Sequence, residues 1–300
     1  MPSGYLHKRC AERACELSGI TPAQGDVLIL GSQGPDPLFM LGMFPLRVSS
    51  RPLSYGNTLH SARTGLFLCA LAKRAREKGD VERAFAMGFL AHYALDSTVH
   101  PYVYAHSLDK KGQYSSLLHM RLEKRWDTLY YRRDGHKGTS VIMPGVHESM
   151  PHWPQIAGAW AEAIRDAYPD MGLSEESILM ALADTDRANR LTHSPAGGKY
   201  ALVWIAERLI GKPMLATSQM GAPRLPAGDI ENAPRLPWRD PADAGTECDE
   251  GLAELFDTAV LRAAELLKAA GRYFDRAMGD DAFAAVVGNA GYDTGKTSMP

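Results

Sequence analysis

DVERAFAMGFLAHYALDSTVHP, from Asp80 to Pro101, is the stretch of this sequence that decides the fold. Its apolar residues recur at helical spacing, and the strict alternation that is typical of a half-buried strand is missing. Asp80 is a good N-cap residue, and Pro101 lacks the amide hydrogen that a continuing helix needs. We therefore predict a helix over 80–101, which contacts the core through Val81, Phe85, Phe89, Leu90 and Leu95.

Three polar side chains repeat at every fourth position of this helix, namely His92, Asp96 and His100. At about 100° per residue they fall within a stripe of roughly 80°, so one helix face presents all three together. In a random chain of this composition, such a string would occur only about 0.02 times. We interpret the triplet as one side of a metal site; the alternative is a hydrogen-bonded pair of core histidines held by Asp96.

The next predicted helix, over 115–132, carries His119 and Glu123 at the same four-residue spacing. A pair of this kind arises about once by chance, so it is informative only beside the triplet. Neutral imidazole and carboxylate suit zinc, and a site with three protein ligands leaves a position open for water. The four cysteines form no Cys-x-x-Cys pair, so the expected donors are nitrogen and oxygen.

Helical periodicity and helix-breaking residues also dominate the rest of the chain. We therefore predict an all-α fold, with a single multi-helix domain over 1–285 and a frayed tail over 286–300. Within that domain, the Pro/Gly-rich segment 211–248 is expected to form a long ordered excursion or a lid. The remaining predicted helices cover 7–17, 58–78, 155–168, 174–210 with a break near Ser194-Pro195, and 249–278.

The composition is that of a folded protein, with 45% hydrophobic and 23% charged residues. A formal net charge of -2 gives no attraction of the whole molecule to nucleic acid, so no stable nucleic-acid partner is expected. No early segment has the pattern of a signal peptide, and no run of about 20 apolar residues can span a bilayer. We expect a cytoplasmic protein without a transmembrane segment.

The strings that carry these side chains resemble the bacterial zinc-dependent phospholipase C family, whose relatives include the P1-type nucleases. The resemblance rests on GFLAHYALDSTVHP at 88–101 and HMRLEKRWD at 119–127. Upstream, His7, Gly34-Pro35-Asp36 and His60 follow in the order of the family. Beyond about residue 130 the resemblance is thinner and rests on Asn232, WRDP at 238–241 and the helix over 252–267.

The resemblance implies an all-α domain of the phospholipase C/P1 nuclease type that holds two or three zinc ions. It implies that one zinc ion is bound by Asp36, His60, His92 and Asp96. Asp96 would also bridge to a neighbouring ion, which His7 binds. The remaining ion would be bound by His100, His119 and Glu123.

Two further roles come from the same resemblance, and two positions leave alternatives open. Asp36 is the family's candidate general base, and Asp127 is expected to orient His119 through a hydrogen bond. Secreted members use a processed N-terminus as a ligand, whereas this sequence starts Met1-Pro2, so the amine of Pro2 is available only if Met1 is removed. In some members the histidine after the bridging aspartate lies further along, so His106 competes with His100; we prefer His100 because it shares the helical face.

The sequence thus predicts a zinc-dependent phosphodiester hydrolase, with a phospholipase C acting on a phospholipid as the first hypothesis. The rivals are a P1-type nuclease and a zinc-binding helical module without catalytic activity. An HD-type phosphohydrolase would need an adjacent His-Asp pair, and that dipeptide does not occur in the sequence.

Overall fold

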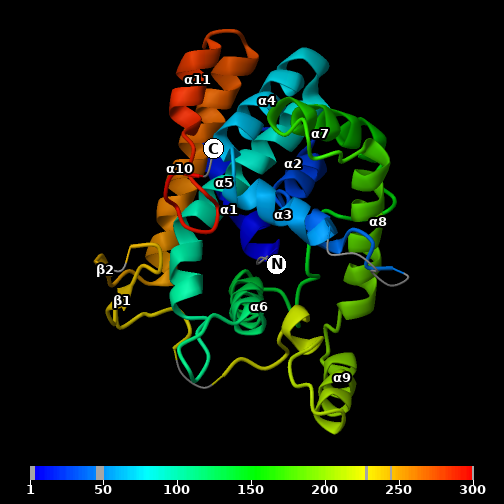
Figure 1. Cartoon of the computed structure of the whole chain (residues 1–300), viewed down its shortest axis with the longest axis vertical. Helices are drawn as coiled ribbons and strands as arrows, with labels where there is room; N and C mark the ends of the chain where they lie inside the picture. Colours follow the sequence, from blue (N-terminus) through cyan, green and yellow to red (C-terminus); the bar gives the residue numbers. More distant parts are fainter. Residues whose placement is uncertain (1–3, 45–50, 227–228, 244, 299–300) are drawn as a thin grey trace.

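The computed structural model of the chain describes residues 4–44, 51–226, 229–243 and 245–298. Helices make up almost all of the regular structure in these residues, and the all-α prediction is confirmed (Figure 1). In the described ranges, no helix is both long enough and apolar enough to cross a bilayer. The elements are α1 (Gly4–Ser18), α2 (Gly25–Gly31), the 3-10 helix η1 (Asp36–Met40), α3 (Arg51–Ser61), α4 (Thr64–Lys78), α5 (Asp80–Ala105), α6 (Ser116–Arg133), α7 (Trp153–Ala167), α8 (Glu175–Thr192), α9 (Gly198–Leu209), the 3-10 helix η2 (Thr217–Gln219), the antiparallel strands β1 (Trp238–Arg239) and β2 (Glu247–Cys248), α10 (Leu252–Phe274) and α11 (Asp280–Val287).

Helix α5 runs through the middle of the molecule, and α1, α2, α4, α7 and α10 pack against it (Figure 1). Apolar side chains on several sides of α5 are buried, including Phe85 and Phe89. The helix α2 approaches so closely at Gly88 that a Cβ atom there would lie 2.2 Å from the carbonyl oxygen of Leu28. Only glycine permits that approach. Surrounding helices therefore bury the ligand-bearing face of α5.

Both ends of α5 differ from the prediction. Gly79 is the N-cap residue and Asp80 is the first helical residue, so the predicted cap is wrong by one position. Pro101 lies inside the helix, which continues for another turn to Ala105. A proline removes one helical hydrogen bond, but the turn beyond it buries Tyr102 and Val103 in the core, and this burial outweighs the loss.

The helix predicted over 58–78 is two helices, α3 and α4. Arg63 stands between them with a φ of 51°, a left-handed conformation that ends one helix and allows the next to begin in a new direction. The break predicted near Ser194-Pro195 is present, since α8 ends at Thr192 and α9 begins at Gly198. The short elements α2, η1 and α11 lie in segments for which no helix was predicted.

The segment that follows α11 returns to the centre of the molecule. The amide of Tyr292 donates to the carbonyl of His60 at 2.8 Å, and the Tyr292 ring is fully buried. An isolated bridge joins Ala290 to Thr297. The prediction of a frayed tail is therefore wrong for the described residues up to Ser298, because Tyr292 packs among the histidines of the core. The predicted domain limits and the lid role of 211–248 stay predictions.

Candidate metal centre

Helix α5 carries three of the predicted ligands one turn apart on a single buried face. His92 Nε2 lies 3.0 Å from Asp96 Oδ2, and His100 Nδ1 lies 3.8 Å from the same oxygen. None of the three is more than 4% exposed. A carboxylate buried at this depth needs charged partners or a metal ion, because burial of an isolated charge is very costly.

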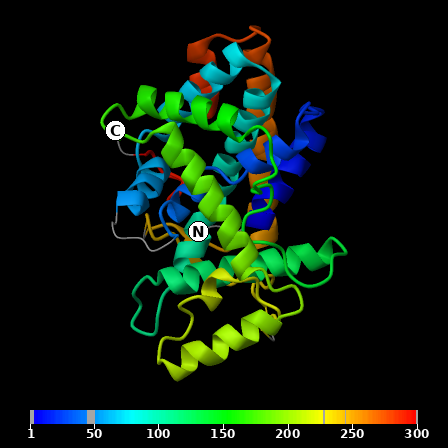
Figure 2. The same ribbon diagram turned by 90° about the vertical axis from the view of Figure 1, so that its right-hand side faces the viewer.

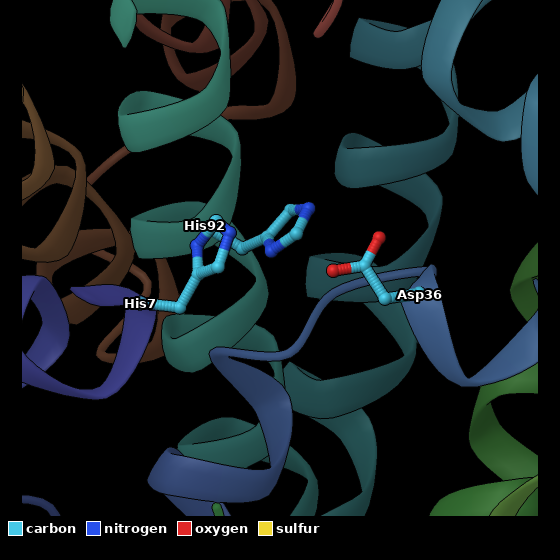
Figure 3. Close-up of side chains that lie close together, drawn as sticks. All are labelled: His7, Asp36 and His92. Atoms are coloured by element: carbon cyan, nitrogen blue, oxygen red, sulfur yellow. The ribbon is translucent and has the colours of Figure 1, made fainter. Parts of the chain in front are cut away.

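Five of the predicted ligands gather around the N-terminal half of this face, and we call them the inner cluster. His7 comes from α1, Asp36 from η1, His60 from α3, and His92 and Asp96 from α5. His7 Nε2 lies 3.2 Å from Asp96 Oδ1, and His60 Nε2 lies 3.2 Å from Asp36 Oδ1. Figure 3 shows the rings of His7 and His92 side by side, with the carboxylate of Asp36 opposite.

The inner cluster offers two overlapping sets of metal ligands. In each set, one donor atom per residue lies within 4.8 Å of the others. The first set is His7, Asp36 and His92, and the second is His60, His92 and Asp96. His92 belongs to both sets. The geometry therefore allows two neighbouring metal positions that both lie beside the His92 ring.

Backbone carbonyl groups orient several of the histidine rings. The Nδ1 atoms of His60, His92 and His100 lie 2.7, 3.1 and 3.1 Å from the carbonyl oxygens of Gly56, Ser32 and Tyr292, respectively. A carbonyl can only accept, so Nδ1 must carry a proton in all three rings, and Nε2 is the atom that can bind a metal when the ring is neutral. This arrangement is typical of histidines that bind a metal through Nε2.

The loop before η1 fits closely against His92. Gly34 has a φ of 55°, and a Cβ atom there would lie 2.3 Å from Cδ2 of the His92 ring. Glycine is needed at this position both for the left-handed conformation and for the space. The GPD string therefore places the backbone against one ligand and brings another, Asp36, to the start of η1.

Asp127 has a different role from the predicted one. Its Oδ1 atom accepts hydrogen bonds from the backbone amides of Tyr5 and Leu6, each at 3.0 Å. These amides lie in the first turn of α1, where they have no helical acceptor. Asp127 therefore holds the helix that carries His7. The prediction that it orients His119 is wrong, because Nδ1 of that ring lies 3.2 Å from the Tyr114 hydroxyl.

The other three predicted ligands, His100, His119 and Glu123, form what we call the outer cluster. Glu123 Oε1 lies 3.3 Å from Nε2 of each histidine, and all three side chains are buried. They also form a set of possible metal ligands. A cavity of about 20 Å³ separates the two clusters, large enough for one water molecule, and its lining includes His7, Asp96, His100 and Glu123.

A larger cavity, of about 190 Å³, opens beside the outer cluster. His60, His100 and His119 lie in its wall. The rings of Tyr104 and Tyr114 stack on each other with their centroids 4.9 Å apart. The rest of the described lining is Phe39, Asn57, Tyr104, Tyr114, Ser116, Met120 and Asp293.

Charge and burial within the clusters place two of the ligands in their metal-binding protonation states. Burial raises the pKa of Asp96, but His100, His92 and His7 together hold it well below its usual value. Burial lowers the pKa of His92, which is therefore neutral at neutral pH. His100 is the opposite case. Burial lowers its pKa, but Asp96 and Glu123 raise it to about 10.

A family model described as zinc dependent phospholipase C matches residues 6–171, more than half of the chain. The match spans all eight residues of the inner and outer clusters. The chain belongs to the zinc-dependent phospholipase C family. Searches of curated proteins and of solved structures found no match.

Zinc, the metal of this phospholipase C family, fits the donor atoms present. Imidazole and carboxylate are both good zinc ligands. His7 Nδ1 and His92 Nε2 are buried and make no hydrogen bond among the residues that the structure describes; His92 Nε2 lies 3.0 Å from Asp96 Oδ2 but has no proton to donate when Nδ1 carries it. Buried polar atoms in that condition are rare in folded proteins, and coordination to a metal would satisfy them. The structure thus supports zinc through several His/Asp/Glu groups.

His106, the alternative to His100, lies away from both clusters. It is the C-cap residue of α5, its ring stacks on Tyr102 at 3.9 Å, and its Nδ1 lies 2.9 Å from the Tyr102 carbonyl. His106 belongs to none of the metal-ligand sets found among the described residues. The geometry favours His100. The Met1-Pro2 start, and with it the amine of Pro2, lies outside the described residues.

Sequence reasoning missed several residues of this candidate site. Tyr292 accepts the hydrogen bond that orients His100, and Asp293 lines the larger cavity and accepts from the Tyr104 hydroxyl at 3.0 Å. Tyr104 follows His100 by four residues, so the helical spacing already placed it on the same face. No local pattern marks Tyr292 or Asp293, because both reach the site only through the return of the chain after α11.

Proposed function

We propose that the protein is a zinc-dependent phosphodiester hydrolase that cleaves phospholipids in the manner of a phospholipase C. One observation carries the proposal: two overlapping His/carboxylate sets and a third set beside them lie along one buried row, and the third set lies in the wall of a cavity. Family membership supports the same class of reaction. A row of metal sites is the arrangement that stabilises the attacking and leaving oxygens of a phosphate ester.

In this proposal the inner cluster holds one or two ions, with Asp96 between them, and the outer cluster holds another. Bound zinc would lower the pKa of a coordinated water molecule and neutralise charge on the phosphate. Asp36 is proposed as a ligand and as the general base that takes up a proton from the attacking water. Its Oδ1 lies 3.2 Å from Nε2 of His60, and His60 lines the cavity, so the Asp36 carboxylate is one side chain away from the cavity wall.

The cavity lining supports a lipid with a cationic head group more than a nucleic acid. No lysine or arginine occurs among the described residues that line it. A strand of DNA or RNA would need basic residues beside the metal ions. Aromatic rings next to a carboxylate suit a quaternary ammonium group, and Tyr104, Tyr114 and Asp293 supply both. We therefore propose phosphatidylcholine as the first substrate to test.

The test combines elemental analysis with a choice of substrates. The purified protein is expected to contain two or three zinc ions and to release diacylglycerol from phosphatidylcholine, with activity lost on chelation and restored by zinc. Cleavage of single-stranded DNA alone would identify the nuclease alternative instead. Stoichiometric zinc without turnover of either substrate or of a chromogenic phosphodiester would identify the non-catalytic module, and a metal-free protein would refute the metal centre itself.

A further inference from the structure

Helix α9 is apolar and yet almost entirely exposed. Leu202, Ile205 and Leu209 are 71%, 48% and 82% exposed, and Trp204 is 43% exposed. Ile210, directly after the helix, is 63% exposed. Large apolar side chains that gather on the surface of a folded protein mark a place of contact with another molecule or with a membrane. Helix α9 lies outside the part of the chain that the family model matches.

A polar contact holds α9 in place. Glu207 is the one buried residue of the helix, and its carboxylate accepts hydrogen bonds from the amides of Met214, Ala216 and Thr217 and from the Thr217 hydroxyl. These hydrogen bonds tie the turn after α9 to the side of the helix that carries Glu207. Because the helix docks through Glu207, its apolar side chains stay available at the surface.

The segment around α9 is positively charged although the whole chain is not. Residues 195–226 contain four basic residues, Lys199, Arg208, Lys212 and Arg224, all exposed, and one acidic residue, the buried Glu207. Four positive charges and one negative charge give a formal charge of +3, against -2 for the whole chain. The guanidinium group of Arg208 lies 4.3 Å from the centroid of the Trp204 ring. Exposed tryptophan and leucine beside basic residues are typical of helices that lie in the head-group region of a membrane.

We propose that α9 anchors the protein to an anionic phospholipid surface, with its apolar side chains inserted among the head groups and its basic residues close to lipid phosphates. The positive charge around α9 favours an anionic membrane over a second copy of the chain as the partner, since two copies of this surface would repel each other. This surface binding does not require the catalytic function proposed above.

The position of α9 connects this surface to the cavity. Figures 1 and 2 both show α9 at the lower end of the molecule, beyond α6. The helix contacts η2, and η2 packs on α6. There Gln219 donates to the sulfur of Met120, which lines the cavity next to His119. An anchored α9 would therefore hold the wall of the cavity near the lipid.

Trp204 gives a direct spectroscopic test. The other four tryptophans are buried, so a change of environment at α9 dominates any change in emission. Addition of vesicles of equimolar phosphatidylcholine and phosphatidylglycerol is expected to shift the emission to shorter wavelength, and vesicles of phosphatidylcholine alone should do so much less. High salt should weaken the binding. The proposal would be overturned if the mixed vesicles caused no shift in emission, or if the protein did not float with them in a flotation assay.

Matched variants separate this proposal from catalysis. The double variant Leu202→Glu/Leu209→Glu should bind mixed vesicles at least about 100-fold more weakly, because each leucine loses its insertion and gains a repelled charge. Leu261→Glu is the control, since Leu261 is a comparably exposed leucine on α10. Asp96→Asn should bind vesicles like the wild type, and the double variant should still cleave a soluble chromogenic phosphodiester if the proposed activity is correct. A wild-type dimer that the double variant converts to a monomer, with no vesicle binding, would instead assign the surface to a second copy.

Discussion

The inner and outer clusters use the same kinds of ligand but are assembled in different ways. The outer cluster takes its residues from α5 and α6. Along the chain, Glu123 lies 23 positions after His100 and four positions after His119. The inner cluster needs α1, η1, α3 and α5, and α1 is itself held by Asp127 from α6. The ligands of the outer site therefore come from two consecutive helices, with one distant support in the Tyr292 carbonyl that orients His100, whereas the inner site draws its ligands from four elements.

This difference has a consequence for sensitivity to mutation. A change far from the outer cluster can disturb it mainly through the Tyr292 carbonyl, which orients His100. The inner cluster depends on a close helix approach at Gly88, a left-handed glycine at Gly34 and a helix cap at Asp127. Loss of any of these contacts should displace the ligands of the inner cluster before those of the outer cluster.

Asp96→Asn should have the largest effect, because the Asp96 carboxylate lies within 4 Å of four histidines and joins the two clusters. The amide keeps the shape but loses the charge, so zinc content should fall to about one ion or less. Phosphodiesterase activity should fall by more than about 100-fold, above the range typical of outer-shell partners. Elemental analysis and a chromogenic assay measure both. Asp281→Asn is the control at an exposed aspartate of α11, and equal zinc content in the two variants would contradict a bridging role for Asp96.

Gly34→Ala should damage the inner cluster alone. Gly42→Ala is its matched control, because Gly42 has a φ of 70° with no atom within 4 Å of an added Cβ. Both variants should lose about 1–2 kcal/mol of unfolding free energy from the left-handed conformation. Gly34→Ala should lose a further ~1–3 kcal/mol, since the new methyl group displaces the His92 ring. Zinc content should fall only in Gly34→Ala; an identical loss in both variants would show that the contact with His92 does not matter.

The pH dependence of zinc binding should distinguish the outer cluster from the inner cluster. The pKa of His100 is raised to about 10, so His100 is protonated at neutral pH and must lose its proton before it binds zinc. Zinc binding there releases a proton, so affinity should rise with pH by up to about tenfold per pH unit between about pH 6 and about pH 8. Calorimetry in two buffers of different ionisation enthalpy measures the proton count. In His119→Ala the outer-cluster part of this release should be lost, and a pH-independent affinity would contradict the pKa of His100.

The sequence predicted the local part of the site better than the assembled part. The four-residue spacing alone was enough to place His92, Asp96 and His100 on one face and to pair His119 with Glu123. His7, Asp36 and His60 entered only through the family resemblance, because they are distant in sequence and lie on three different elements. The structure brings all eight together, but their roles as ligands stay a prediction.

The errors share a physical cause. Pro101 did not end α5, the chain after α11 was not a frayed tail, and Asp127 did not orient His119. In each case the partner that decides the outcome lies far away in the sequence: the core around Tyr102 and Val103, the histidines beneath Tyr292, and the first turn of α1. Propensity and spacing describe neighbours along the chain, and tertiary packing overrides them.

The hydrogen bond between His100 and the carbonyl of Tyr292 joins residues 192 positions apart. During synthesis, α5 and α6 leave the ribosome long before Tyr292 does. Until then the His100 ring lacks the acceptor that fixes its orientation, and the carbonyl of His60 lacks its amide donor. The centre therefore acquires its final geometry late, after most of the helices have already packed.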